Sequence, residues 1–394
     1  MNALSDRINN LSTSQTLAMA AKARELKAQG KDIISLSLGE PDFNTPDFIK
    51  EAAIQAIHEN YSTYSPVDGY VELKEAICRK FKRDNNLDYR PSQIVVSTGA
   101  KQSLYNIAQV MLNEGDEVIL PAPYWVSYFE IIKLSGGIPV EVPTSVHNDF
   151  KITPEQLEAA ITPKTKMMWF SSPCNPSGSV YSREELTAIG KVLDRHPGIY
   201  IVSDEIYEHI NFSGTFCSVA SIPGLFERTI TVNGVAKAFA MTGWRIGYIG
   251  APEFIAKACT KMQGQVTSGA NSIAQRATIT AVDADPAVLK EMVAAFHSRR
   301  DLVVGLLKEI PGVKINVPEG AFYVFPDVSS FFGKTLNGIT INNADDLSMY
   351  LLEYANVATV TGDAFGNPDC IRFSYATSEA LLTEALRRIK NALA

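Results

Sequence analysis

The sequence lacks several features that would mark other classes of protein. Its 36 Lys and Arg residues are outnumbered by 43 Asp and Glu residues, so no basic nucleic-acid surface is indicated. The five cysteines are scattered without a C-x-x-C pair, which argues against a disulfide framework or a zinc site. No apolar run approaches the ~18 residues of a membrane span, and the start, MNALSDRINN, has no apolar signal segment. We therefore expect a cytoplasmic protein of enzyme size, with no metal, membrane or nucleic-acid partner.

What the chain does contain is an alternation of short apolar runs with longer amphipathic segments. This alternation is typical of β–α units around a mostly parallel sheet. The expected strands are 94–98, 117–120, 138–142, 166–171, 200–203, 229–232 and 246–249, and the clearest helices between them are 102–112, 183–194 and 252–263. The pattern predicts an α/β fold.

A change of pattern near residue 285 predicts a second, smaller domain. The large domain is expected over 45–285, and the long periodic segment 286–309 predicts one helix leading out of it. The rest of 286–394 mixes strand-like and helical segments, which indicates an α+β unit. Residues 1–44 contain an expected helix at 15–29 and are predicted to join that unit, so the small domain is built from both chain ends.

Four loop segments each follow a predicted strand: STGAKQS, SSPCNPSG, SDEIYEH and NGVAKAF. Ligands in open α/β sheets lie beyond the carboxyl ends of the strands, so these segments are expected to converge on one crevice. Lys237, in NGVAKAF, has apolar neighbours, and burial would lower its pKa and favour the nucleophilic free amine. Taken alone, the same residue is compatible with a surface lysine at a strand end.

Three polar residues in the second and third of these segments are candidates for binding a charged ligand. Asp204 ends an apolar strand, where a buried carboxylate needs a cationic partner, although it is equally compatible with a helix N-cap. Tyr207 lies three residues on and could donate a hydrogen bond to an anionic oxygen. Asn175, in a turn bracketed by prolines, offers both a donor and an acceptor, or is an ordinary turn residue.

Gly99, Trp125 and Arg372 complete the set that the residues themselves suggest. Gly99 stands at a strand-to-helix junction, where free backbone N–H groups suit a phosphate. The absence of a G-x-G-x-x-G fingerprint disfavours a nicotinamide dehydrogenase. Trp125 could stack on a planar ring or pack in the core. Arg372, in the apolar segment CIRFSYA, needs an anion, which is either a ligand carboxylate or a buried partner side chain.

These segments occur in an order that resembles a known family. The ordered set SLGEPDF, YSPVDGY, TGAKQSLYN, PYWVSY, SSPCNPSG, SDEIYEH, NGVAKAFAMTGWRIGY, GAFYVF and IRFSYA is similar to the fold-type-I, class I/II aminotransferases that use pyridoxal 5′-phosphate (PLP). The resemblance covers nearly the whole chain, and within the family it is to the bacterial aspartate aminotransferase branch related to prephenate aminotransferases. It implies a large PLP-binding domain, with a mostly parallel sheet between helices, and a smaller α+β domain.

The resemblance also implies a role for each cofactor-binding residue. Lys237 would form an imine with PLP and then move a proton, while Asp204 would pair with the ring nitrogen. Asn175 and Tyr207 would bond the phenolate oxygen of the ring, and Trp125 would cover the ring. The phosphate would be held at the helix start by Gly99, Ala100 and Lys101, by Arg245, and by Tyr64 of the partner subunit in a homodimer with shared active sites.

The substrate roles implied by the resemblance concern two carboxylates. The α-carboxylate would lie on Arg372, Asn175 and the N–H of Gly39. The resemblance places a distal carboxylate on Lys101, while Thr16, Ser14 and Ser103 are hydrogen-bonding candidates because such a carboxylate needs several donors. The expected reaction is ping-pong amino transfer between L-aspartate or glutamate and 2-oxoglutarate or oxaloacetate, with prephenate as a further candidate. Small-molecule amino and 2-oxo acids are thus the expected partners.

Two alternatives to this reaction remain, and two positions depart from the family. The alternatives are an aminotransferase that prefers alanine or aromatic amino acids and a PLP-dependent β-eliminating lyase, because the fold does not fix the reaction. A non-catalytic binding module is disfavoured because no basic patch is present. Gly234 stands where many members of the family have a phosphate-binding serine, and Cys174 stands where other residues are usual.

Overall fold

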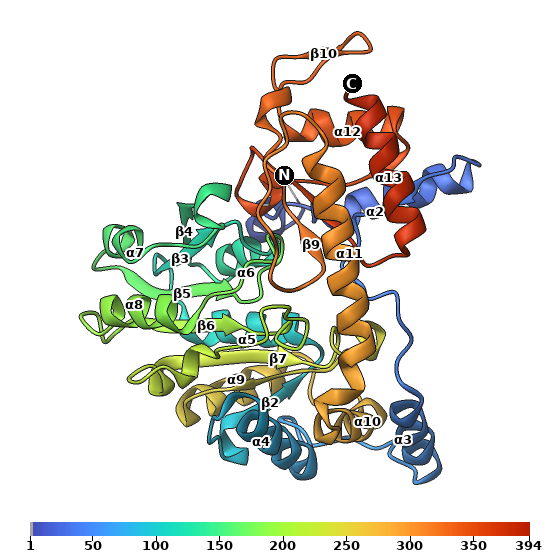
Figure 1. Cartoon of the computed structure of the whole chain (residues 1–394). Helices are drawn as coiled ribbons and strands as arrows, with labels where there is room; N and C mark the ends of the chain where they lie inside the picture. The colour runs from blue at the N-terminus through green and yellow to red at the C-terminus, as the bar shows by residue number, and fades with distance from the viewer. Residues whose placement is uncertain (1–2) are drawn as a thin grey trace.

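Seven strands form the central sheet of the protein, whose computed structural model describes residues 3–394 (Figure 1). In spatial order they are β2 (Ile94–Ser97), β8 (Gly247–Gly250), β7 (Thr229–Gly234), β6 (Tyr200–Asp204), β5 (Thr165–Ser171), β3 (Glu117–Ala122) and β4 (Ile138–Pro143). All neighbours pair in parallel except β8, which is antiparallel to both β2 and β7. The predicted α/β fold with a mostly parallel sheet is confirmed.

Helices cover both faces of this sheet, which explains why its strands are apolar on both sides. Along β3, Val118 and Leu120 pack against one group of helices and Ile119 packs against the other. The first group is α5 (Ala100–Met111), α6 (Ser127–Leu134) and α9 (Glu253–Val266). The second contains α7 (Pro154–Ala160) and α8 (Arg183–Leu193). Each buried strand therefore holds one layer of helices on each side.

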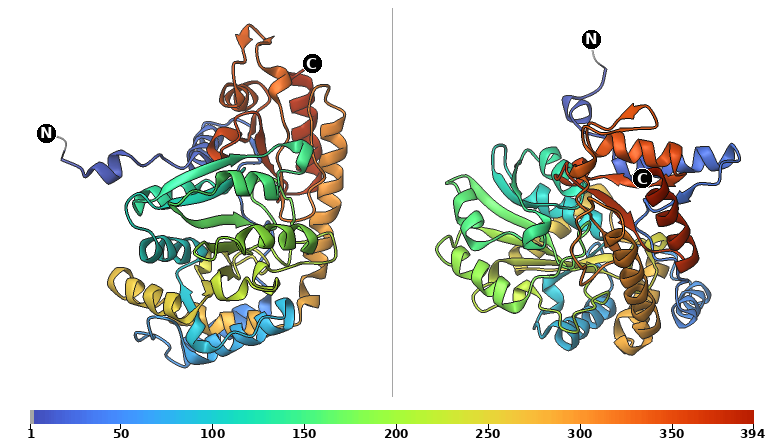
Figure 2. Two further views of the ribbon diagram at one scale, coloured as in Figure 1. Left: turned by 90° about the vertical axis from the view of Figure 1, so that its left-hand side faces the viewer. Right: turned by 45° about the horizontal axis from the view of Figure 1, so that its top comes forward.

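Several helices were absent from the sequence prediction. They are α3 (Asp47–His58), α4 (Val71–Asn85), α6, α7 and α10 (Ser272–Asp283). Helices α3 and α4 both pack on α10, and the three helices form, with parts of the C-terminal unit, the largest apolar cluster. Near the N-terminus, α2 (Gln15–Ala28) matches the expected helix, whereas α1 (Asp6–Asn9) buries no residue and stands out from the body in Figure 2.

The C-terminal unit begins with a long helix and contains three small sheets. The helix predicted over 286–309 is α11 (Lys290–Lys308), preceded by a tighter 3-10 turn at Pro286–Leu289. Strands β13 (Val360–Thr361), β14 (Ile371–Ser374) and β9 (Tyr323–Val324) form an antiparallel sheet, and β10 (Thr335–Leu336) and β11 (Ile339–Thr340) form a hairpin. Helices α12 (Ala344–Tyr354) and α13 (Glu379–Ala392) complete the unit.

The two ends of the chain meet in one short sheet. Strand β1 (Ile34–Ser35) pairs in parallel with β12 (Val357–Ala358), so the N-terminal segment is attached to the C-terminal unit. The domain boundaries near 44 and 285 stay predictions. Among the helices of residues 3–394, none is both long enough and apolar enough to cross a membrane.

Candidate active site

A cavity of about 470 Å³ opens at the carboxyl ends of the central strands. It brings together nearly all of the residues singled out in the sequence. The cavity is lined by Ser14, Thr16, Gly39, Gly99, Ala100, Lys101, Trp125, Asn175, Asp204, Tyr207, Lys237, Arg245 and Arg372. The topology explains the convergence, because Asp204 ends β6, Lys237 follows the neighbouring β7, and Ala100 begins the helix that follows β2.

Lys237 is held inside this cavity as a weak base. Its Nζ donates a hydrogen bond to the carbonyl oxygen of Gly39 at 2.6 Å. Burial lowers the pKa of Lys237 to about 8, with Glu40 opposing the shift and Arg372 adding to it. An amine with this pKa is far more often neutral near pH 7 than an exposed lysine, and a neutral amine is the nucleophilic form.

Asp204 is a buried carboxylate without a cationic side-chain partner. Its Oδ2 accepts a hydrogen bond from the Tyr128 hydroxyl at 2.7 Å, and its Oδ1 accepts one from the N–H of Ile206 at 3.2 Å. Burial raises the pKa of Asp204, and within residues 3–394 the carboxylate forms no ion pair. A buried anion of this kind is stabilised by a cation brought into the cavity.

Arg372 is the complementary case, a buried cation whose hydrogen-bond partners are neutral. The side chain is 1% exposed; it donates to Asn175 Oδ1 at 3.0 Å and to the carbonyl oxygen of Ser37 at 2.6 Å. Its Nε is buried without a hydrogen-bond partner, and burial lowers the pKa of Arg372. The cavity therefore offers an unpaired cation to an incoming carboxylate.

The start of α5 and Arg245 form a second place for an anion. Gly99 has φ +81, and a Cβ there would lie 2.6 Å from a guanidinium nitrogen of Arg245, so glycine is required for this close approach. The free amides of a helix start and an adjacent guanidinium suit a phosphate group. Gly234 is also confined, since a Cβ would lie 3.0 Å from the Ile246 carbonyl oxygen. The strand end therefore has little room for a larger side chain such as serine at Gly234.

Of the remaining predicted residues, Lys101 lines the cavity, whereas Ser103 and Tyr64 do not. The Lys101 ammonium lies 4.8 Å from the Trp125 ring centroid, and burial together with Arg245 lowers the pKa of Lys101. The prediction for Ser103 is wrong: its side chain is buried on the inner face of α5, its hydroxyl has no partner, and it does not line the cavity. Tyr64 also lies outside the cavity, with its side chain 98% exposed.

Two tyrosines that line the cavity were missed in the sequence. Tyr323 places its hydroxyl 2.7 Å from that of Tyr207, and the Arg372 guanidinium lies 4.6 Å from its ring centroid. A Cβ at Gly39 would collide with the Tyr323 hydroxyl, which explains the glycine. Tyr128 donates to Asp204. Their only sequence signals were their places in GAFYVF and PYWVSY, which do not indicate these contacts.

Comparison with known proteins agrees with this geometry. The model of the family "Aminotransferase class I and II" matches residues 31–389. The aspartate/prephenate aminotransferase of Cereibacter sphaeroides is 51% identical over 390 residues, which cover 98% of each chain. The aspartate aminotransferase of Bacillus subtilis is 48% identical over 389 residues, again 98% of each.

Solved structures give the same result. The crystal structure of the Rhizobium meliloti aspartate aminotransferase has a TM-score of 0.96 at 46% identity, covering 100% of this chain and 99% of that one. The Thermus thermophilus aspartate aminotransferase with maleate has a TM-score of 0.93 at 42% identity and covers 100% of both chains. On the family match and these relatives, the chain belongs to the class I and II aminotransferases and is an aminotransferase enzyme.

Proposed function

We propose that this aminotransferase uses PLP, held by Lys237, to move an amino group between aspartate or glutamate and 2-oxoglutarate or oxaloacetate. One observation carries the proposal. Lys237, a lysine with a lowered pKa, lies in one cavity with the buried carboxylate of Asp204 and the buried guanidinium of Arg372, neither of which forms an ion pair among residues 3–394. The residues fit PLP, because Asp204 would meet its ring nitrogen and the Gly99–Arg245 anion site would meet its phosphate. When bound, PLP supplies an aldehyde and an electron-accepting ring.

Each of these side chains has a separate role in the proposed reaction. Lys237 would hold PLP covalently through its amine, and as a free amine it would be the base that removes the substrate α-proton. Arg372 and Asn175 hold the α-carboxylate, which fixes the bond to hydrogen in position for cleavage. Tyr207 would hydrogen-bond the ring oxygen of PLP, and its hydroxyl contacts that of Tyr323. Both half-reactions would use these same groups, so the first product has to leave before the second substrate binds, and ping-pong kinetics are expected.

The dicarboxylate preference rests on Lys101 and on the relatives. Lys101 lines the cavity, and so do Ser14 and Thr16 at the start of α2. Relatives that cover the whole chain are named aspartate or aspartate/prephenate aminotransferases, and one was solved with maleate, a four-carbon dicarboxylate. Prephenate, which also carries two carboxylates, is the further acceptor that we propose.

An assay with purified protein tests the proposed reaction. Incubation with aspartate and 2-oxoglutarate should yield oxaloacetate and glutamate in equal amounts, and prephenate with glutamate should also react. Pyruvate or ammonia without oxaloacetate would show a β-eliminating lyase instead. A rate with alanine or phenylalanine that exceeds the aspartate rate would contradict the dicarboxylate preference.

Replacing Lys101 with alanine should weaken binding of dicarboxylic substrates. A charge-assisted hydrogen bond is worth about 1.5–3 kcal/mol, and partial exposure places this one at the lower end, so KM for aspartate should rise roughly ten-fold. Alanine has no distal carboxylate, so its kcat/KM should change little. Steady-state kinetics with both substrates test this; an equal loss for both would assign Lys101 to the cofactor rather than to the distal carboxylate.

We also propose a homodimer in which Tyr64 of the partner subunit reaches the phosphate of PLP. The exposed Tyr64 side chain, which lies outside its own cavity, supports this assignment. Tyr64→Phe should lower cofactor affinity about ten-fold through loss of one charge-assisted hydrogen bond. Tyr61→Phe is the matched control, because that ring packs against Tyr70 of the same chain. Unchanged affinity in Tyr64→Phe, or a monomer by sedimentation, would contradict the shared site.

The cytoplasmic location stays a prediction.

A further inference from the structure

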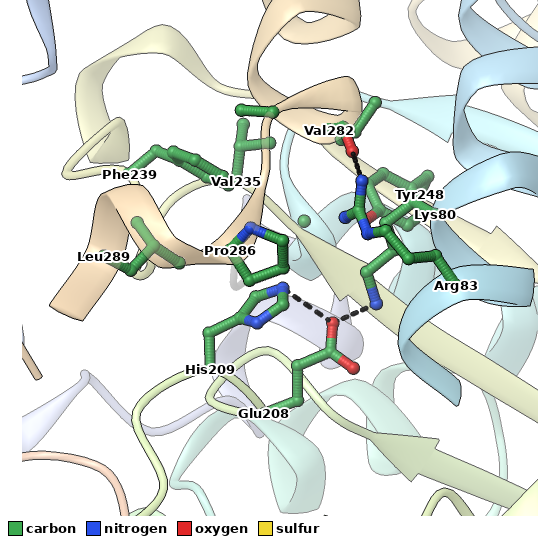
Figure 3. Close-up of a pocket in the computed structure, with 12 residues that line it drawn as sticks. Lys80, Arg83, Glu208, His209, Val235, Phe239, Tyr248, Val282, Pro286 and Leu289 are labelled. Carbon is green, nitrogen blue, oxygen red and sulfur yellow. Dashed lines mark hydrogen bonds and ion pairs between the residues drawn. The ribbon is translucent and has the colours of Figure 1, made fainter. Parts of the chain in front are cut away.

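A buried polar cluster lies beside the segments that carry Tyr207 and Lys237. It consists of Lys80, Asp84, Asn85, Glu208, His209 and Asn233, and is called the Glu208 cluster here. Three of its members line a cavity of about 10 Å³ (Figure 3). This cavity holds about one water molecule at most, so the cluster is packed interior and not a second substrate site.

Glu208 is the centre of the cluster and accepts hydrogen bonds from three directions. Its Oε1 accepts from the Lys80 ammonium and from Asn233 Nδ2 at 2.8 Å, and its Oε2 accepts from Asn85 Nδ2 at 2.6 Å. In Figure 3 both Lys80 and His209 face this carboxylate. Burial alone would raise the pKa of Glu208, but Lys80, His209 and the hydrogen bonds lower it to about 2. Glu208 is therefore a stable anion in the interior.

A metal ion is not needed to explain the cluster. Among residues 3–394, Asp84, Glu208 and His209 are grouped closely enough to hold one. However, Lys80 Nζ already contacts Glu208 and lies 3.8 Å from Asp84. The ammonium group supplies the positive charge that a metal would bring, within the same small space.

The cluster connects the two segments that carry the proposed catalytic pair. Glu208 directly follows Tyr207, while Asn233 lies near the end of β7, four residues before Lys237. Asn233 Oδ1 accepts the N–H of Gly234 at 2.7 Å while its Nδ2 donates to Glu208. One amide thus ties the chain leading to Lys237 to the residue after Tyr207. In the cavity, Lys237 Nζ lies 5.7 Å from the Tyr207 ring centroid.

We propose that Glu208 and Asn233 are positioning residues that hold Lys237 and Tyr207 in register, with Lys80 as the built-in counter-charge. Buried ion pairs contribute little net stability compared with apolar packing, so fixed geometry is the better explanation for this one. The inference rests on the proposed function, since it names what keeps the proposed catalytic pair in place. Small displacements of reacting groups reduce kcat strongly, whereas substrate affinity depends on Arg372 and Lys101, which lie on other segments.

Two variants of the holoenzyme test the proposal. Asn233→Ala removes the tie and leaves the ion pair, and the double variant Lys80→Met/Glu208→Gln removes the ion pair without leaving a lone buried charge. In both, kcat with aspartate and 2-oxoglutarate should fall about 10- to 100-fold, with little change in KM. The visible circular dichroism of bound PLP, which reports how its ring is held, should lose amplitude.

Glu205→Gln is the matched control because Glu205 is also a buried glutamate beside the same segment. It accepts from the hydroxyls of Ser203 and Ser218, and burial raises its pKa to about 8, so glutamine resembles its protonated form. This variant should keep the wild-type kcat and dichroism. If both cluster variants kept the wild-type kcat and dichroism, even with a lower Tm, this inference would be overturned while the proposed function would stand. A wild-type enzyme inactive with these substrates would refute the proposed function as well.

Discussion

Replacing Lys237 with alanine should reduce the rate of amino transfer by roughly 10⁴-fold, the upper end of what one general base contributes. The effect is at this end because the same side chain is proposed both to bind the cofactor covalently and to move the proton. Its pKa of about 8 leaves about one amine in ten neutral at pH 7. Covalent loading of cofactor-free protein should therefore speed up as pH rises, with a midpoint near 8, the pKa of the amine.

Lys101 provides the control for this prediction, because it is a second lysine in the same cavity and its pKa is also lowered. Borohydride reduction of the wild-type protein with PLP, followed by peptide mass spectrometry, should label Lys237 and leave Lys101 unlabelled. Lys101→Ala should still be labelled, and Lys237→Ala should not. Label on Lys101, or undiminished turnover by Lys237→Ala, would contradict the assignment.

The central sheet could be predicted because its strands are buried on both faces and therefore appear as continuous apolar runs, as Val118–Ile119–Leu120 shows. Helices α3 and α10 were not predicted because they lack such a clear apolar pattern. They pack on each other, and most of their buried residues are small, such as Ala53 and Ala56 on α3 and Ala274 and Ala277 on α10, although α3 also buries Ile49. Their identity as helices depends on this mutual packing, which a local pattern does not show.

The candidate site could be predicted where topology alone brings residues together. Asp204 ends one strand and Lys237 follows the adjacent parallel strand, so the sheet itself brings the two residues together. The contacts of Tyr128 with Asp204 and of Tyr323 with Tyr207 join residues 76 and 116 positions apart, and no spacing rule indicates them. The prediction for Ser103, a hydrogen-bonding candidate for a distal carboxylate, is wrong. Its side chain lies on the buried face of α5 and does not line the cavity, and a hydroxyl group gives no sign of this in the sequence.

Asp204→Asn should reduce kcat by about 10²–10³-fold, the loss typical when one preorganised charged partner is removed. Asparagine keeps the shape of the side chain: its Oδ1 can accept from the N–H of Ile206 and its Nδ2 can donate to the Tyr128 hydroxyl, so the fold should be retained. What disappears is the negative charge, and a neutral amide does not hold a ring nitrogen in its protonated form. The α-carboxylate still binds Arg372, so KM for aspartate should change far less than kcat.

Tyr128→Phe separates the charge of Asp204 from its surroundings. This variant removes the hydroxyl that donates to Asp204 Oδ2 but leaves the carboxylate, which should then attract a cation in the cavity more strongly. Its kcat should stay within about ten-fold of the wild type, the low end of the roughly 1.5–3 kcal/mol that a hydrogen bond to a charged group contributes, because the negative charge itself is retained. Steady-state kinetics of the two variants make the comparison. If Tyr128→Phe lost as much activity as Asp204→Asn, the shape of this hydrogen-bonded pair, rather than the negative charge, would be what the reaction requires.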